Sequence, residues 1–115
     1  MIDGLEIFEY NGEGYNRTMN YGEWRVALLN YAERFDEKKA TYLERHFLTD
    51  EVFVLLGGAA KLIIGENKQA VVMEQQKLYN IKAGVWHQIF VSKDAKVLVI
   101  ENHNTGADNS EHMPL

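Results

Sequence analysis

Residues 41–58 read TYLERHFLTDEVFVLLGG, and the second half of this stretch has the strongest strand pattern in the chain. Val52–Leu56 is a short apolar run, and Gly57-Gly58 follows it as a predicted hairpin turn. Outside this stretch, further short apolar runs between turn residues occupy residues 62–64, 70–73, 89–91 and 97–100. Short strands at this spacing are typical of an antiparallel barrel or sandwich. We therefore expect an all-β fold, a single antiparallel β-barrel.

The length and composition favour one small globular domain. A chain of 115 residues predicts a single domain over residues 1–115. The chain has 17 acidic and 12 basic residues, and the resulting net charge of −5 argues against nucleic-acid binding. The absence of cysteine excludes disulfides, zinc–thiolate sites, iron–sulfur clusters and a cysteine nucleophile. The apolar runs are too short to cross a membrane and the first residues lack a signal-peptide pattern, so we expect a cytoplasmic protein.

The segment from Trp24 to Phe35 is ambiguous by periodicity alone. Its apolar residues recur at helical spacing, but residues 24–31 also alternate as a strand would. A strand is favoured because predicted strands surround this segment. We also expect a short strand at Leu5–Phe8 and an extended polar tail over residues 103–115.

Titratable residues gather on both sides of the turn before the strongest strand. Glu44 and His46 share one face of a predicted strand over residues 41–46. The turn that follows would bring Glu51 close to them, and His87 enters a later strand on an inward, apolar face. Two imidazoles and two carboxylates inside a barrel could bind a divalent metal such as Fe, Mn, Ni, Zn or Cu. The alternative is that each inward histidine only packs and hydrogen-bonds within the core.

Two short motifs in this region resemble those of the cupin superfamily. His46, Glu51 and Gly58, separated by four and then six residues, resemble the first cupin motif. Gly84 and His87, separated by two residues, resemble the second. The short stretch between the two motifs is similar to that of small single-domain bacterial cupins.

The resemblance covers about residues 41–101 and implies a jelly-roll β-barrel, with a strand rather than a helix in the ambiguous segment. It also implies a divalent metal with His46, Glu51 and His87 as ligands. The family usually has His-x-His in the first motif, whereas this chain has Glu44 at the first histidine position. Glu44 keeps a ligand atom at this position but adds negative charge, which would favour a harder cation.

Five further residues are candidates for a ligand pocket: Tyr42, Phe53, Tyr79, Trp86 and Arg25. The aromatic rings could stack on an apolar or sugar-like ligand, and Arg25 could bind an anionic substrate. The alternatives are that the aromatic residues belong to the core and that the arginine is solvated on the outside of a strand.

Three functions are compatible with these residues. The first is a metal-dependent enzyme of the oxygenase, isomerase or lyase type that acts on a small polar metabolite, with Glu44 or Glu51 as a base. The second is a barrel that binds a small ligand without turnover. The third is a metal-free barrel that transfers protons, as in cupin-like sugar-nucleotide isomerases. Metal content and chelator sensitivity distinguish the first function from the other two.

The outward face of the strongest strand is also apolar. Val52, Val54 and Leu56 occupy positions where an antiparallel sheet facing water would carry polar residues. Either the N-terminal segment or a second copy must cover this face. Because cupins commonly pair through such a sheet, we expect a homodimer.

Overall fold

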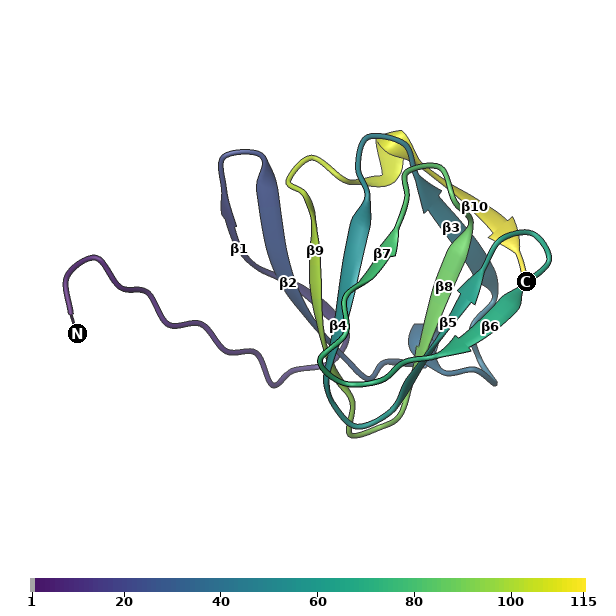
Figure 1. Cartoon of the computed structure of the whole chain (residues 1–115), viewed down its shortest axis with the longest axis horizontal. Helices are drawn as coiled ribbons and strands as arrows, with labels where there is room; N and C mark the ends of the chain where they lie inside the picture. The colour runs from purple at the N-terminus through teal and green to yellow at the C-terminus, as the bar shows by residue number, and fades with distance from the viewer. Residues whose placement is uncertain (1) are drawn as a thin grey trace.

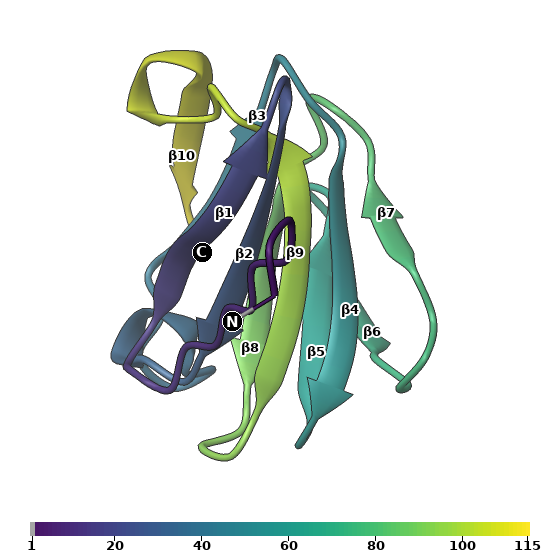
Figure 2. The same cartoon turned by 90° about the vertical axis from the view of Figure 1, so that its left-hand side faces the viewer.

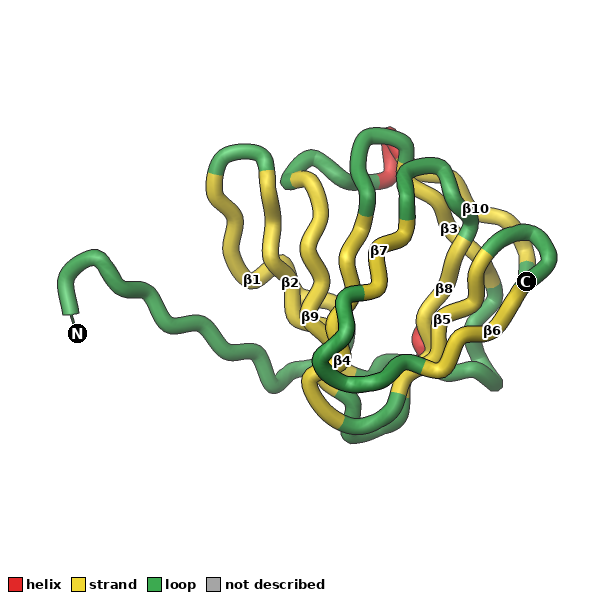
Figure 3. Tube along the Cα trace, viewed as in Figure 1, coloured by secondary structure: helices red, strands yellow, loops and turns green. Residues whose placement is uncertain are grey.

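The computed structural model describes residues 2–115, which form ten strands and two three-residue 3-10 helices. The strands are β1 (Tyr15–Tyr21), β2 (Trp24–Asn30), β3 (Tyr42–His46), β4 (Glu51–Gly57), β5 (Ala60–Ile64), β6 (Gln69–Val72), β7 (Tyr79–Ile81), β8 (His87–Val91), β9 (Lys96–Asn102) and β10 (Ser110–Pro114). The 3-10 helices are η1 (Glu33–Phe35) and η2 (Ala107–Asn109). Apart from these two short helices, the described chain consists of strands and loops (Figure 3). The predicted all-β fold is confirmed.

The strands pair in two antiparallel sheets of five strands each (Figure 1). The first sheet has the order β1-β2-β9-β4-β7, and the second has the order β10-β3-β8-β5-β6. Figure 2 shows the strands of the first sheet side by side. Most neighbours within a sheet are distant in the sequence, because the chain passes repeatedly from one sheet to the other, as in a jelly roll. Within residues 2–115, no helix is long and apolar enough to span a membrane.

The core lies between the two sheets and follows from the alternation of side chains along each strand. The predicted strand in the ambiguous segment is confirmed as β2, in which every second residue is buried. Buried apolar side chains from both sheets include Ala27, Leu29, Phe53, Leu55, Leu62, Ile89, Val97 and Val99. This core holds the two sheets together and fixes the inward direction of the polar residues that continue the same faces.

The predicted hairpin at Gly57-Gly58 is wrong, because β4 and β5 lie in different sheets. These glycines instead begin the crossing from the first sheet to the second. Gly58 has a φ of 69°, and a Cβ at this position would lie 2.6 Å from the Cα of Ala95. A glycine is needed here because the backbones approach closely in a left-handed conformation.

The predicted strand at Leu5–Phe8 is also wrong, since residues 5–9 have no strand assignment and extend away from the sheets (Figure 1). The apolar pattern of this segment does not pack on the core, as Ile7 is 81% exposed. Residues 103–115, expected as a polar tail, contain η2 and then β10. β10 pairs along its whole length with β3.

Candidate functional site

A cavity of about 240 Å³ between the two sheets contains the titratable residues singled out in the sequence. Its lining comes from β1, β2, β3, β4, β8, β9 and β10, together with η1 and the segment 105–107. Glu44, His46, Glu51 and His87 all line this cavity and are called here the His–Glu cluster. A larger and shallower depression around Asn30 and Lys96 lies elsewhere on the surface and contains no histidine.

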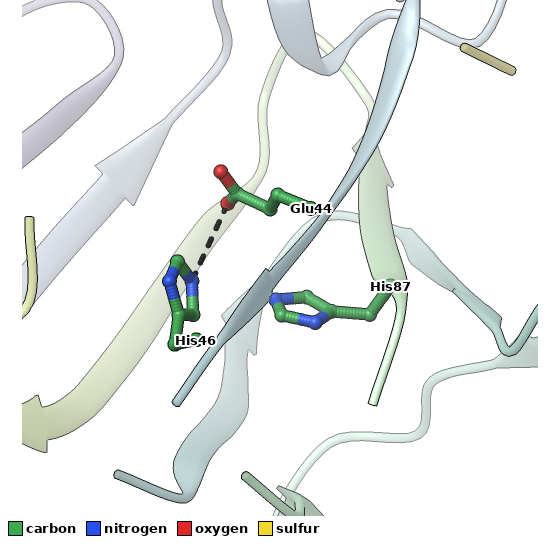
Figure 4. A group of neighbouring side chains, drawn as sticks. All are labelled: Glu44, His46 and His87. Atoms are coloured by element: carbon green, nitrogen blue, oxygen red, sulfur yellow. Dashed lines mark ion pairs between the residues drawn. The ribbon is translucent and has the colours of Figure 1, made fainter. Parts of the chain in front are cut away.

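Strand register brings three members of the cluster together. Glu44 and His46 alternate with Leu43 on β3, so both face the cavity while Leu43 is fully buried on the other face. Glu44 lies directly opposite His87 in the antiparallel pairing of β3 with β8. Side chains at directly opposite positions share one face of a sheet. Figure 4 shows the result: the Glu44 carboxylate is paired with His46, and the His46 and His87 rings lie near each other.

Glu51 completes the cluster from the first sheet. It is the first residue of β4 and is buried on the same face as Phe53 and Leu55. Its Oε1 atom lies 2.9 Å from His87 Nε2 and 3.5 Å from His46 Nε2. Glu44 Oε1 lies 3.7 Å from the same His46 Nε2. The two imidazoles therefore converge, through equivalent ring nitrogens, on carboxylates from both sheets.

The second nitrogen of each ring is held by a separate contact. His46 Nδ1 lies 2.7 Å from the hydroxyl oxygen of Ser110, the first residue of β10. His87 Nδ1 lies 3.0 Å from the carbonyl oxygen of Val85, to which it donates. Such contacts on the far nitrogen orient an imidazole and leave the other nitrogen for a ligand. The pairing of β10 with β3 thus fixes the direction of the His46 ring.

Charge pairing dominates the titration of the cluster. Burial alone would lower the pKa of His46, but the hydrogen-bonded carboxylates of Glu44 and Glu51 outweigh it and raise the pKa to about 10. The pKa of His87 is raised as well, because Glu51 outweighs its burial. Burial would raise the pKa of Glu51, yet the two histidines hold it below its ordinary value. The cluster is therefore a set of ion pairs at neutral pH.

A buried network beside the cluster was missed in the sequence. Glu101 on β9 lies opposite Arg25 on β2 in register, and Arg25 Nη1 lies 3.2 Å from Glu101 Oε1. Tyr15 also donates a hydrogen bond to Glu101 Oε1. Burial and the neighbouring charge of Glu51 raise the pKa of Glu101 to about 7. The alternation of side chains along the strand could have indicated that Glu101 is buried, because Glu101 lies on the same face of β9 as the buried Val97 and Val99.

The five pocket candidates lie in different places. Phe53 lines the cavity, whereas Arg25 is buried behind Glu101 and is not a solvated outer residue. Tyr42 stacks on His112, with ring centroids 4.1 Å apart, next to the cavity lining. Tyr79 lines a separate depression beside β7, and Trp86 lies under the guanidinium of Arg45. The structure thus places Phe53 alone of these five in the cavity wall.

The donor set fits a divalent metal. Donor atoms of Glu44, His46 and His87 all lie within 4.8 Å of one another, and so do those of His46, Glu51 and Glu101. Ligands about 2.0–2.2 Å from a metal lie roughly 3–4 Å apart, and the separations within the cluster are similar. The buried Oε2 of Glu101 has no hydrogen-bond partner among residues 2–115. An unsatisfied buried carboxylate oxygen beside the His46 imidazole and the Glu51 carboxylate is compatible with a bound cation.

Comparison with known proteins identifies the fold. No protein-family model and no curated protein sequence matches the chain. Among solved structures, it is similar to a cupin-2 domain protein from Shewanella frigidimarina, with a TM-score of 0.63 and 19% identity over 82% of this chain and 85% of that chain. The fold is therefore that of the cupin superfamily.

Two further solved structures have related folds and described functions. The chain is similar to Streptomyces Pac13 with bound uridine, at a TM-score of 0.68 and 12% identity over 94% of this chain and 85% of that chain. Pac13 is described as a nucleoside dehydratase. A putative sugar phosphate isomerase from Acidithiobacillus ferrooxidans gives a TM-score of 0.56 and 15% identity over 71% of this chain and 51% of that chain. At these identities the likeness shows the fold alone.

Proposed function

We propose that this protein is a small metal-dependent cupin that acts on a small polar metabolite in the cavity. One observation carries the proposal: two buried imidazoles, each fixed through Nδ1, direct Nε2 toward the same carboxylate oxygen of Glu51. His46, His87, Glu51 and Glu44 would hold the ion. The metal identity is left open among Fe, Mn, Ni and Zn, because these ligand types suit all four.

The metal and the residues that line the cavity would have different roles. When bound, the metal supplies a Lewis acid that polarises an oxygen atom of the ligand. Phe53 and Ile89 form an apolar part of the wall and exclude water from one side. Glu101 lies in the same wall, where Arg25 and Tyr15 hold its Oε1 and leave Oε2 without a partner among the described residues.

Metal content is the direct test of this proposal. Untagged protein purified without chelator is expected to contain about one divalent ion per chain, measured by elemental analysis. EDTA should lower its melting temperature, because an ion at a hundredfold excess over its dissociation constant stabilises the folded state by about 2.7 kcal/mol. Affinity should rise from pH 6 to pH 8, because binding displaces the proton that His46 holds with a pKa of about 10. A metal-free wild type with an EDTA-insensitive melting temperature would contradict the proposal.

The alternative is a barrel that transfers protons without a metal. It is favoured by the hydrogen bond between His87 Nε2 and the Glu51 carboxylate, 2.9 Å long, because an imidazole and a carboxylate in direct contact can exchange a proton without a metal. The likeness to Pac13 is compatible with it. In this case activity on a nucleoside or sugar-like substrate would be unaffected by chelator. A small-ligand carrier is the third possibility, distinguished by binding without turnover.

We also propose that the protein is a homodimer, formed through the outer face of the first sheet. Val52 lies opposite Ile100, and Val54 lies opposite Leu98, so these apolar side chains form one continuous outer patch. Leu56, on the same strand, is 49% exposed. The N-terminal arm, residues 2–13, does not cover this patch, because all of its residues except the half-buried Tyr10 are exposed. A second copy is the occupant that remains.

Sedimentation at micromolar concentration tests the dimer. The wild type should sediment at twice the 13.3 kDa chain mass, and a Val54→Lys variant should sediment as a monomer. The matched control is Gln69→Lys on β6 of the other sheet, where the side chain is already exposed. A monomeric wild type would contradict the dimer. The cytoplasmic location expected from the sequence stays a prediction.

A further inference from the structure

The charges around the cavity are unevenly distributed. The chain has four arginines, and two of them are neutralised by carboxylates: Arg25 pairs with Glu101, and Arg45 pairs with Glu111. Arg17 and Arg34 form no ion pair with any carboxylate within residues 2–115, and both line the cavity of the His–Glu cluster. Both are exposed, so they lie at the solvent side of this cavity.

The two arginines come from separate elements. Arg17 lies on β1, two residues after Tyr15, which reaches Glu101 in the cavity wall. Arg34 lies in η1, where its guanidinium carbon is 4.4 Å from the centre of the Phe35 ring. Its Nη1 atom is 3.4 Å from the hydroxyl oxygen of Tyr42. These contacts hold the Arg34 guanidinium in place without neutralising its charge.

In the inner part of the cavity, in contrast, charges of both signs are paired. Glu44, Glu51 and Glu101 place three carboxyl groups around the two histidines. The two histidines pair with Glu44 and Glu51, and Arg25 pairs with Glu101, so these charges are offset within the protein. The positive charge without a carboxylate partner in the cavity lining lies on the two guanidinium groups at the solvent side, and an anionic group on a ligand would be attracted to them. The protein as a whole, with a net charge of −5, repels anions. The two arginines without carboxylate partners make the potential at the cavity more positive, and this favours the approach of an anion.

We infer that the cavity binds a small molecule that carries an oxyanion, either a carboxylate or a phosphate, which Arg17 and Arg34 bind at the entrance. The uncharged end of this molecule, a hydroxyl or carbonyl group, then points toward the His–Glu cluster. A cavity of about 240 Å³ has the volume of about eight water molecules, which limits the ligand to a small metabolite. Guanidinium groups bind both kinds of oxyanion through paired hydrogen bonds. The inference rests on the proposed function in one respect, that this cavity is the ligand site.

Three small probes with one carbon skeleton test the inference by isothermal titration calorimetry: glycerol 3-phosphate, glycerate and glycerol. The wild type should bind at least one of the two anions, and binding of glycerol should be at least about tenfold weaker, because glycerol lacks the charged group that the guanidinium groups bind. A preference between the two anions identifies phosphate or carboxylate as the group recognised. Failure of the wild type to bind either anion, or equal binding of glycerol, would overturn the inference.

Variants locate the binding site. Arg17→Ala and Arg34→Ala should each weaken anion binding by about tenfold or more, and the double variant should abolish it. Arg34→Lys should restore part of the affinity, since lysine keeps the charge but not the paired hydrogen bonds. Arg45→Ala is the matched control and should bind as the wild type does, because Arg45 does not line the cavity. Unchanged binding in the double variant would overturn the inference.

The same proteins separate this inference from the proposed metal site. Neither Arg17 nor Arg34 contacts the His–Glu cluster, so the double variant should keep the metal content and melting temperature of the wild type. Metal retention without anion binding in the wild type would overturn the inference alone. Arginine-dependent anion binding in a metal-free wild type would support the inference and contradict the metal site.

Discussion

Replacing His87 by alanine is expected to abolish metal retention and, with it, the part of the thermal stability that a chelator removes. His87 is 3% exposed, and its Nε2 faces Glu51 while Nδ1 is held by the Val85 carbonyl. Alanine removes one imidazole ligand and leaves Glu51 with His46 as its remaining histidine partner. Elemental analysis and melting curves with and without EDTA measure both effects. The variant should contain no metal and should melt at the same temperature in both conditions.

The control for this variant is a histidine that lies outside the cavity. His103 is exposed on the turn after β9 and lies outside the cavity lining. A His103→Ala variant should therefore retain metal and respond to EDTA as the wild type does. If His87→Ala keeps its metal, or if both variants lose it equally, His87 is not a ligand. A wild type that never held metal would reduce His87 to a packing and hydrogen-bonding residue, with only a cavity cost on substitution.

At pH 8.5, where Glu101 is ionised in the wild type, replacing Arg25 by alanine is expected to lower the free energy of unfolding by about 3–5 kcal/mol, because it leaves the buried Glu101 without its cationic partner. The Arg25 and Glu101 side chains are only 8% and 4% exposed. Arg25 also donates to the carbonyl oxygens of His103 and Thr105, which fixes the turn after β9 against β2. Urea unfolding of the variant and the wild type measures the difference.

The loss should depend on pH in a defined direction. Glu101 has a pKa of about 7 in the folded protein, above its ordinary value of 4.5, so its protonated form is stabilised on folding. A raised carboxyl pKa contributes stability below pH 4.5, and this stability is lost as the pH rises through about 7. Without Arg25 the ionised form becomes less favourable still. The gap between variant and wild type should therefore be larger at pH 8.5 than at pH 6.

The exposed pair of Arg45 and Glu111 is the control for this effect. Arg45→Ala removes an ion pair whose side chains are 31% and 51% exposed, and such pairs contribute about 0–1 kcal/mol. An Arg25→Ala/Glu101→Gln double variant should recover part of the stability, because it removes the uncompensated charge. Equal losses for Arg25→Ala and Arg45→Ala would show that the buried pair does not stabilise the fold.

Much of the fold and part of the site could be predicted from alternation along single strands. The short apolar runs predicted the all-β fold, and alternation placed Glu44 with His46 and Glu51 with Phe53. The structure brings these residues together with His87. Alternation describes one strand at a time, however, and the contact between Arg25 and Glu101 depends on the pairing of β2 with β9. Pairing between strands this distant in sequence has no local signal.

The incorrect predictions have the same physical origin. Leu5–Phe8 is apolar enough for a strand, but a strand also needs a free sheet edge, and local composition contains no information about edges. The C-terminal segment is polar and was expected to be an extended tail, yet β10 finds such an edge beside β3. Its Ser110 orients His46, so a residue outside the recognised motifs takes part in the site.

The division of the His–Glu cluster between the two sheets has a kinetic consequence. Glu51 belongs to the first sheet, whereas Glu44, His46 and His87 belong to the second. An ion held by all four side chains would act as a cross-link between the sheets, with its donors spread over a long interval of sequence. Separation of the sheets at this end of the molecule would break bonds between the ion and one sheet or the other. The protein should therefore unfold more slowly with the ion bound than in the presence of EDTA.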